Sequence, residues 1–248
     1  MLPSIKLACG QILGLVLLWA AASAHQQSAD PVAATKSASF AIAEKAFQWM
    51  PESFRRVMSR NLDSLRDGIN EIRAEKFVMP PERLTLEEEA LRRMTGTVSR
   101  LQSRPKFSEI AKDFGALSQM MLLLNLPETE ADSIDKLLVL EDVIGRNSQA
   151  FRIVVYDAAE IGGGRDEVRN LLDTVRQRRK KISERFAEVQ STHMPVAAPA
   201  SLDPRSPLYG IAALVYSHAI NDTARTWLWI WMSANGDMSG RPSLQAQP

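Results

Sequence analysis

Apolar residues recur at the three- and four-residue spacing of an α-helix along most of this chain. One such stretch starts near Ser37, and the next starts at Pro51, a residue type favoured at helix beginnings. Thr85 and Glu88 have the spacing of a capping box immediately before a further apolar run. No sustained two-residue alternation indicates a strand. The pattern therefore predicts an all-α protein, a multi-helix bundle of about six to eight helices.

The second half of the chain contains the longest predicted helices. Residues 134–159 could form one long helix, or a helix followed by a short strand at the β-branched residues Ile153–Val155. Residues 165–190 have the most regular amphipathic pattern, with the basic run Arg176–Lys181 mostly on the polar face. We interpret that run as a solvated helix face rather than a docking surface. Residues 208–233 are predicted as the last helix.

The first 24 residues have the organisation of a secretory signal peptide. Lys6 supplies the positive charge, Ile12–Trp19 the apolar core, and Ala22–Ala24 the small residues of a cleavage site. The core is shorter than a membrane span, and the other apolar runs are shorter still. We therefore expect an exported protein, periplasmic or extracellular, with no transmembrane span in the mature chain.

Composition divides the remainder into a single helical domain with flexible ends. Residues 25–36 are rich in Ala, Ser and Gln and are predicted as a flexible lead-in. The helical domain is predicted to cover residues 37–234 and to contain a Pro- and Ala-rich linker at 194–207. Residues 235–248 are predicted as a disordered tail.

Composition also limits the chemistry. The single cysteine, Cys9, lies inside the predicted signal peptide, so the mature chain offers no disulfide and no thiolate ligand. The chain has 30 Lys and Arg against 29 Asp and Glu. This balance indicates no general nucleic-acid binding.

His218 and Asp222 are the main candidates for chemistry. They are four residues apart in the last predicted helix, so their side chains share a face and could reach one metal ion or each other. A nitrogen and a carboxylate oxygen suit zinc, although two ligands do not complete a site. The alternative is a buried His–Asp hydrogen bond that only stabilises helix packing. His193 fits a helix C-terminal cap, and His25 would be the mature N-terminus.

The stretch Tyr216–Asp222 resembles the His-x-x-x-Asp helix of the zinc-dependent phospholipase C superfamily, which includes single-strand-specific nucleases. The resemblance implies a secreted, all-α protein that holds several zinc ions. It extends to Gly115–Gln119, where the family would usually offer a second His-x-x-x-Asp. Gln119 and Leu123 stand at those two positions, so the resemblance implies a degenerate metal site.

Three functional hypotheses remain open at this point. The first is a non-catalytic exported protein that needs no cofactor and acts through a surface or pocket near the Trp-rich helix. Trp227, Trp229 and Trp231 cannot all face one core, so at least one is expected to be exposed to a protein, lipid or glycan, unless the helix is buried all round.

The second hypothesis is a zinc-dependent phosphoesterase, of phospholipase C or nuclease type. It would use His218 and Asp222, with further carboxylates from Asp67, Glu71 or Asp157 and a metal-activated water. The third is a membrane-surface protein whose basic helix meets lipid headgroups. The sequence does not choose among substrates or partners.

Overall fold

The fold is known from a computed structural model that describes residues 37–75, 85–103, 106–128, 134–154, 165–192, 194–199 and 201–242. All of these described residues belong to one compact unit. The predicted signal peptide and lead-in lie outside the described residues, as do His25, Asp157, His193 and residues 243–248.

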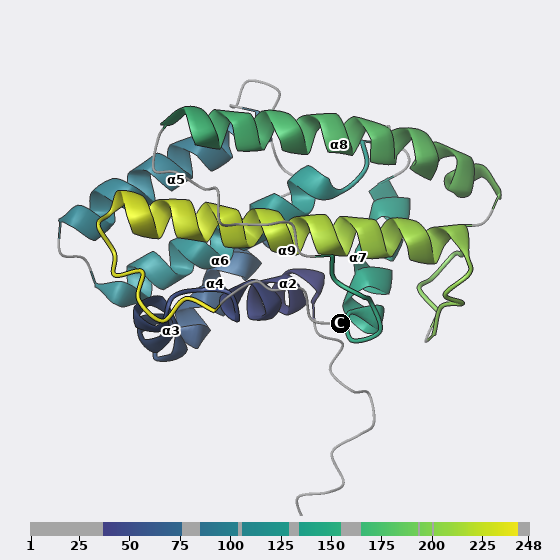
Figure 1. Ribbon diagram of the computed structural model, residues 1–248. Coiled ribbons are helices and arrows are strands. Elements are labelled where there is room, and N and C mark those ends of the chain that lie inside the picture. The colour runs from purple at the N-terminus through teal and green to yellow at the C-terminus, as the bar shows by residue number, and fades with distance from the viewer. Residues whose placement is uncertain are drawn as a thin grey trace, which may run out of the picture. The chain divides into compact units, whose positions relative to one another are not determined.

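The regular structure of the described residues consists of α-helices. The described residues form α2 (Ala38–Phe47), α3 (Glu52–Ser59), α4 (Leu62–Glu75), α5 (Leu86–Gln102), α6 (Phe107–Asn125), α7 (Ile134–Asn147), α8 (Arg165–Thr192) and α9 (Pro207–Ser233) (Figure 1). No strand occurs among these residues, and Ile153 and Val154 are irregular. The prediction of an all-α multi-helix bundle is therefore confirmed.

Local sequence signals set several helix boundaries. At the start of α5 the Thr85 hydroxyl accepts a hydrogen bond from the Glu88 backbone, while the Glu88 carboxylate accepts one from the Thr85 backbone at 2.8 Å. The predicted capping box is thus present. Helix α9 starts at Pro207 because the preceding Ser206 accepts a hydrogen bond from the Tyr209 backbone and proline suits the first helical position.

Helix α9 is the central element of the bundle. It contacts α2, α5, α6, α7 and α8, and α8 runs beside it (Figure 1). Nineteen of its residues are buried, including most residues from Val215 to Trp231. A helix that is mostly apolar all round is expected in this position because every face meets a neighbour.

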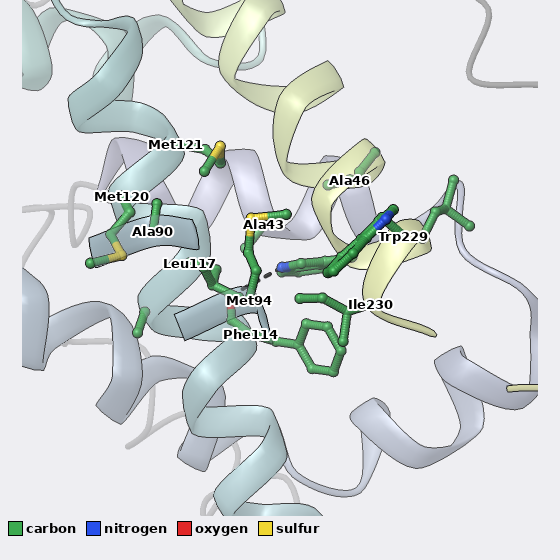
Figure 2. Packing of buried hydrophobic residues seen from close by; sticks show 14 of the residues in the cluster. Ala43, Ala46, Ala90, Met94, Phe114, Leu117, Met120, Met121, Trp229 and Ile230 are labelled. Atoms are coloured by element: carbon green, nitrogen blue, oxygen red, sulfur yellow. Dashed lines mark hydrogen bonds between the residues drawn. The ribbon is translucent and has the colours of Figure 1, made fainter. Parts of the chain in front are cut away.

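Two clusters of apolar side chains form the core along α9. One gathers around Phe54, Phe114 and Trp227, whose rings pack with centroid separations of 5.0 to 5.7 Å. Figure 2 shows Phe114, Met94 and Ile230 within this cluster. The other cluster surrounds Tyr216 near the start of α9. Both clusters draw on α6, so α6 and α9 position the side chains described below.

Helices α4 and α6 cross with their backbones in close approach. A Cβ atom at Gly68 would lie 1.9 Å from the Lys112 carbonyl oxygen, and one at Gly115 would lie 1.9 Å from the Leu65 carbonyl oxygen. These distances leave no room for any side chain. Glycine at both positions therefore allows the crossing.

The tryptophans of α9 are all buried, so the alternative of a helix buried all round is the one found, and the expectation that at least one is exposed is wrong. Trp227, Trp229 and Trp231 are 0%, 4% and 7% exposed. Trp227 donates a hydrogen bond to the Phe114 carbonyl oxygen at 3.1 Å, and Trp231 donates one to the Asp237 carbonyl oxygen at 3.0 Å. The reason is that α9 has neighbours on every side, so side chains pointing in different directions all meet protein.

Part of the segment that we expected to be a disordered tail contacts α3. The Ser53 hydroxyl donates to the Asp237 carbonyl oxygen at 2.6 Å, and the Glu52 backbone donates to the Ser239 carbonyl oxygen at 3.2 Å. Asn235 adopts a left-handed backbone conformation, with φ of 59°, immediately after α9. This turn brings Gly236 and Asp237 against the Trp231 side chain.

Candidate functional site

Asp222 is the most deeply buried charged group on α9, with an exposed fraction of 0%. The Arg178 guanidinium of α8 approaches it through Nη2, which lies 2.7 Å from Oδ1 and 2.6 Å from Oδ2. Asn125, at the end of α6, donates to Oδ2 from its side-chain amide at 2.8 Å. Asp222 therefore joins α6, α8 and α9 through one carboxylate.

His218 lies one turn before Asp222 and contacts the same guanidinium. Its Nδ1 atom is 3.2 Å from Nη1 of Arg178. A guanidinium can only donate hydrogen bonds, so Nδ1 acts as the acceptor and the ring proton belongs on Nε2. Arg178 thus bridges the two residues that the sequence places on one helix face.

The surroundings of His218 favour its neutral form. Burial lowers the pKa of the imidazole below the ordinary value of 6.5, and the positive charge of Arg178 lowers it further. The carboxylate of Asp222 opposes this shift but is the smaller influence. The group at this site is therefore a neutral imidazole beside a charged Arg–Asp pair.

The acidic residues of α4 lie elsewhere in the fold. Nζ of Lys112 donates a hydrogen bond to the Glu71 carboxylate at 2.7 Å, and this contact lowers the pKa of the Glu71 carboxyl. Lys112 precedes Asn125 by thirteen positions on α6, which corresponds to roughly 20 Å along a helix. Asp67 is exposed on the same helix as Glu71. Neither carboxylate is brought to His218.

No group of three or more His, Cys, Asp or Glu side chains that could hold a metal ion is found among the described residues. Gln119 and Leu123, the two positions that depart from the phospholipase C pattern, contact other parts of the protein. Gln119 is fully buried and accepts a hydrogen bond from the Ser39 hydroxyl of α2. Leu123 is half-buried and packs against the apolar core.

Sequence reasoning missed Arg178 and Asn125 as partners of Asp222. Arg178 belongs to the basic run that we assigned mostly to the solvated face, yet its side chain is only 20% exposed. Its neighbour Arg179 also turns toward protein and donates to the Leu126 carbonyl oxygen at 2.9 Å. Two signals were available: a carboxylate on an apolar helix face needs a cationic partner, and Arg178 is three residues after Val175 and four before Ile182.

A pocket lies two turns further along α9. Its volume is about 370 Å³, and it opens between α5 and α8 above Trp229. The lining residues come from three helices: Glu88, Leu91, Arg92 and Thr95 from α5, Val168 and Arg169 from α8, and Trp229 from α9. Asp222 and Trp229 are seven residues apart and therefore project from the same side of α9.

No protein-family model, curated protein or solved structure matches this chain. None of the described helices is long and apolar enough to cross a membrane. The features of the described residues that bear on function are the polar cluster, formed by Asn125, Arg178, His218 and Asp222, and the Trp229 pocket.

Proposed function

We propose that this chain is an exported, non-catalytic helical binding protein with a degenerate phospholipase C-like domain. The observation that carries the proposal is the position of the Arg178 guanidinium between Asp222 and His218. In this arrangement a fixed protein cation occupies the space between the two side chains that would otherwise bind zinc. The polar cluster then serves to fasten α8 to α9.

The contacts of Asp222 support a structural role. Arg178 and Asn125 together engage both of its oxygens, which are the atoms that would ligate a metal. An arginine side chain stays charged at every physiological pH, so the pair does not open by deprotonation. Removing one member of a buried ion pair costs about 3–5 kcal/mol, so a metal would have to compensate for displacing Arg178.

The state of His218 supports the same proposal. A zinc ligand must present an unprotonated ring nitrogen to the metal. Here the unprotonated Nδ1 is directed at Arg178, and Nε2 carries the proton. Zinc binding through Nδ1 would displace Arg178, and zinc binding through Nε2 would require the other tautomer, which also loses the arginine contact.

Export is proposed from the first 24 residues, and kinship with the phospholipase C superfamily from the stretch Tyr216–Asp222. A binding role is proposed because the side of α9 that carries the polar cluster also carries the Trp229 pocket. Partners other than the ligand of this pocket are not assigned.

The test is a measurement of metal content and hydrolysis on the purified mature protein. The protein is incubated with equimolar zinc, desalted and analysed by mass spectrometry, and it is assayed with bis(p-nitrophenyl) phosphate and phosphatidylcholine. We expect zinc well below one ion per chain and hydrolysis equal to that of the His218→Ala variant. Stoichiometric zinc together with hydrolysis that His218→Ala abolishes would establish the phosphoesterase instead.

A further inference from the structure

We propose that the Trp229 pocket binds a small amphiphilic anion, a monocarboxylate with an apolar chain. The proposal rests on the binding role proposed above and names the chemical class of the ligand. It depends on residues of α5, α8 and α9 that make no contribution to the polar cluster at Asp222.

The inner part of the pocket is apolar. Val168 and Trp229 are 1% and 4% exposed and form its floor, while the half-buried Leu91 lies on one wall. Ligand pockets in proteins are lined mainly by such side chains and have volumes of about 300–1,000 Å³. A pocket of about 370 Å³ lies at the lower end of this range, so the ligand is small.

Arg169 gives the rim its positive charge. Its side chain is exposed, and it makes no hydrogen bond or ion pair with any of the described residues. The second arginine at the rim is already neutralised, because Arg92 donates to both oxygens of Glu89 at 2.6 and 2.5 Å. Of the two arginines that line the pocket, Arg169 is therefore the one without an anionic partner among the described residues.

Glu88 is the acidic residue that lines the pocket, and it would repel an anion. Its Oε2 atom is held by the backbone and hydroxyl of Thr85 at 2.8 and 3.0 Å, in the capping box of α5. A carboxylate at a helix N-terminus is opposed by the positive end of the helix dipole. Its effect on a ligand beside Arg169 is thereby reduced.

The remaining polar side chain cannot help to hold an anion. The Thr95 hydroxyl donates within its own helix, to the Leu91 and Arg92 carbonyl oxygens. With Arg92 paired to Glu89 and Thr95 bonded within its own helix, Arg169 is left to meet the ligand, which suits a single negative charge rather than a phosphate dianion. The apolar floor adds affinity only for a ligand with a hydrocarbon part.

The experiment uses the mature protein and three probes with the same ten-carbon chain: decanoate, decanol and decyltrimethylammonium, each below its micelle concentration. Binding is measured by isothermal titration calorimetry. The variants are Arg169→Gln, Thr95→Phe, which fills the pocket, and Arg205→Gln as a control. Arg205 is exposed outside the pocket and undergoes the same change of charge.

We expect decanoate to bind most tightly, with roughly threefold to tenfold weaker binding in Arg169→Gln, as for loss of one hydrogen bond of ordinary net strength. Arg205→Gln should match the wild type, and Thr95→Phe should lose binding of decanoate and decanol alike. No binding of any probe, tighter binding of the cationic probe, or equal binding by the two arginine variants would overturn the proposal. Zinc content and hydrolysis, measured on the same preparation, report separately on the proposed function.

Discussion

At the level of single residues, the polar cluster follows from the cost of burying charge. A carboxylate excluded from water is stable only if its charge is neutralised and its oxygens receive hydrogen bonds. Asp222 obtains both from Arg178 and Asn125, and the pKa of His218 is lowered by burial and then by the same arginine against its ring. One buried carboxylate thus fixes the positions of Arg178 and Asn125, and through Arg178 it influences His218.

Replacing Asp222 by Asn should strongly destabilise the protein. The change leaves the guanidinium of Arg178, which is only 20% exposed, without its negative partner. We expect the free energy of unfolding to fall by roughly 2–4 kcal/mol, measured by urea denaturation, because a charge remains buried and unpaired.

The control for this variant is Asp142→Asn. Asp142 pairs with Arg146 on the surface of α7, where both side chains are about 40% exposed. Such a pair contributes about 0–1 kcal/mol, so this variant should unfold at nearly the wild-type urea concentration. Equal effects of the two substitutions would mean that the Asp222 pair is not a buried one.

His218 should make the stability of the fold depend on pH. Its pKa in the folded protein lies below the unfolded value near 6.5 because burial and Arg178 disfavour the charged ring. The unfolded state therefore takes up a proton first, and stability is full above about pH 6.5 and falls as the pH drops below it.

His218→Gln removes this titration while retaining a hydrogen-bond acceptor for Arg178. The free energy of unfolding, measured between pH 7.5 and 5, should fall less steeply in the variant than in the wild type. Because the other two histidines are present in both proteins, the difference reports on His218. Parallel pH profiles would show that the ring is not held neutral by the fold.

At the level of helices, the crossing of α4 and α6 depends on two glycines. Gly68→Ala or Gly115→Ala would place a methyl group 1.9 Å from a backbone carbonyl oxygen of the other helix. A backbone cannot yield as the end of a flexible side chain can. We expect each variant to lose at least about 2 kcal/mol of unfolding free energy in urea denaturation.

Gly210→Ala in α9 is the matched control, because no atom lies within 4 Å of a Cβ built at that position. Alanine is favoured over glycine inside a helix by about 1 kcal/mol, so this variant should be as stable as the wild type or more so. Gly68→Ala variants with wild-type stability would show that the two helices are further apart than described.

Helix ends were predictable because they depend on a few neighbouring residues. The capping box at Thr85 and the proline at the start of α9 act within one turn, so their effect is readable from the sequence. The rotation of α8 about its own axis could not be predicted in this way. Arg178 lies at the boundary between the apolar and polar faces, and its burial depends on how the helix is rotated against α9.

At the level of the whole molecule, the position of α9 explains which predictions failed. Trp227 and Trp231 both pack on Phe54, whereas Trp229 lines the pocket between α5 and α8, so the burial of all three required knowing which helices surround α9. The His218–Asp222 pair was correctly placed on one face by spacing alone. Its partners Arg178 and Asn125 are 44 and 97 residues away from Asp222, a distance over which local patterns give no information.

The central claim is that a guanidinium, and not a metal ion, holds the polar side of α9. The most direct test is a nitrogen-15 NMR spectrum of the His218 ring in the mature protein, recorded near neutral pH before and after one equivalent of zinc. We predict a ring with a protonated Nε2 and an unprotonated, hydrogen-bonded Nδ1, unchanged by zinc. Loss of the Nε2 proton with a metal-induced shift on zinc addition would contradict the claim.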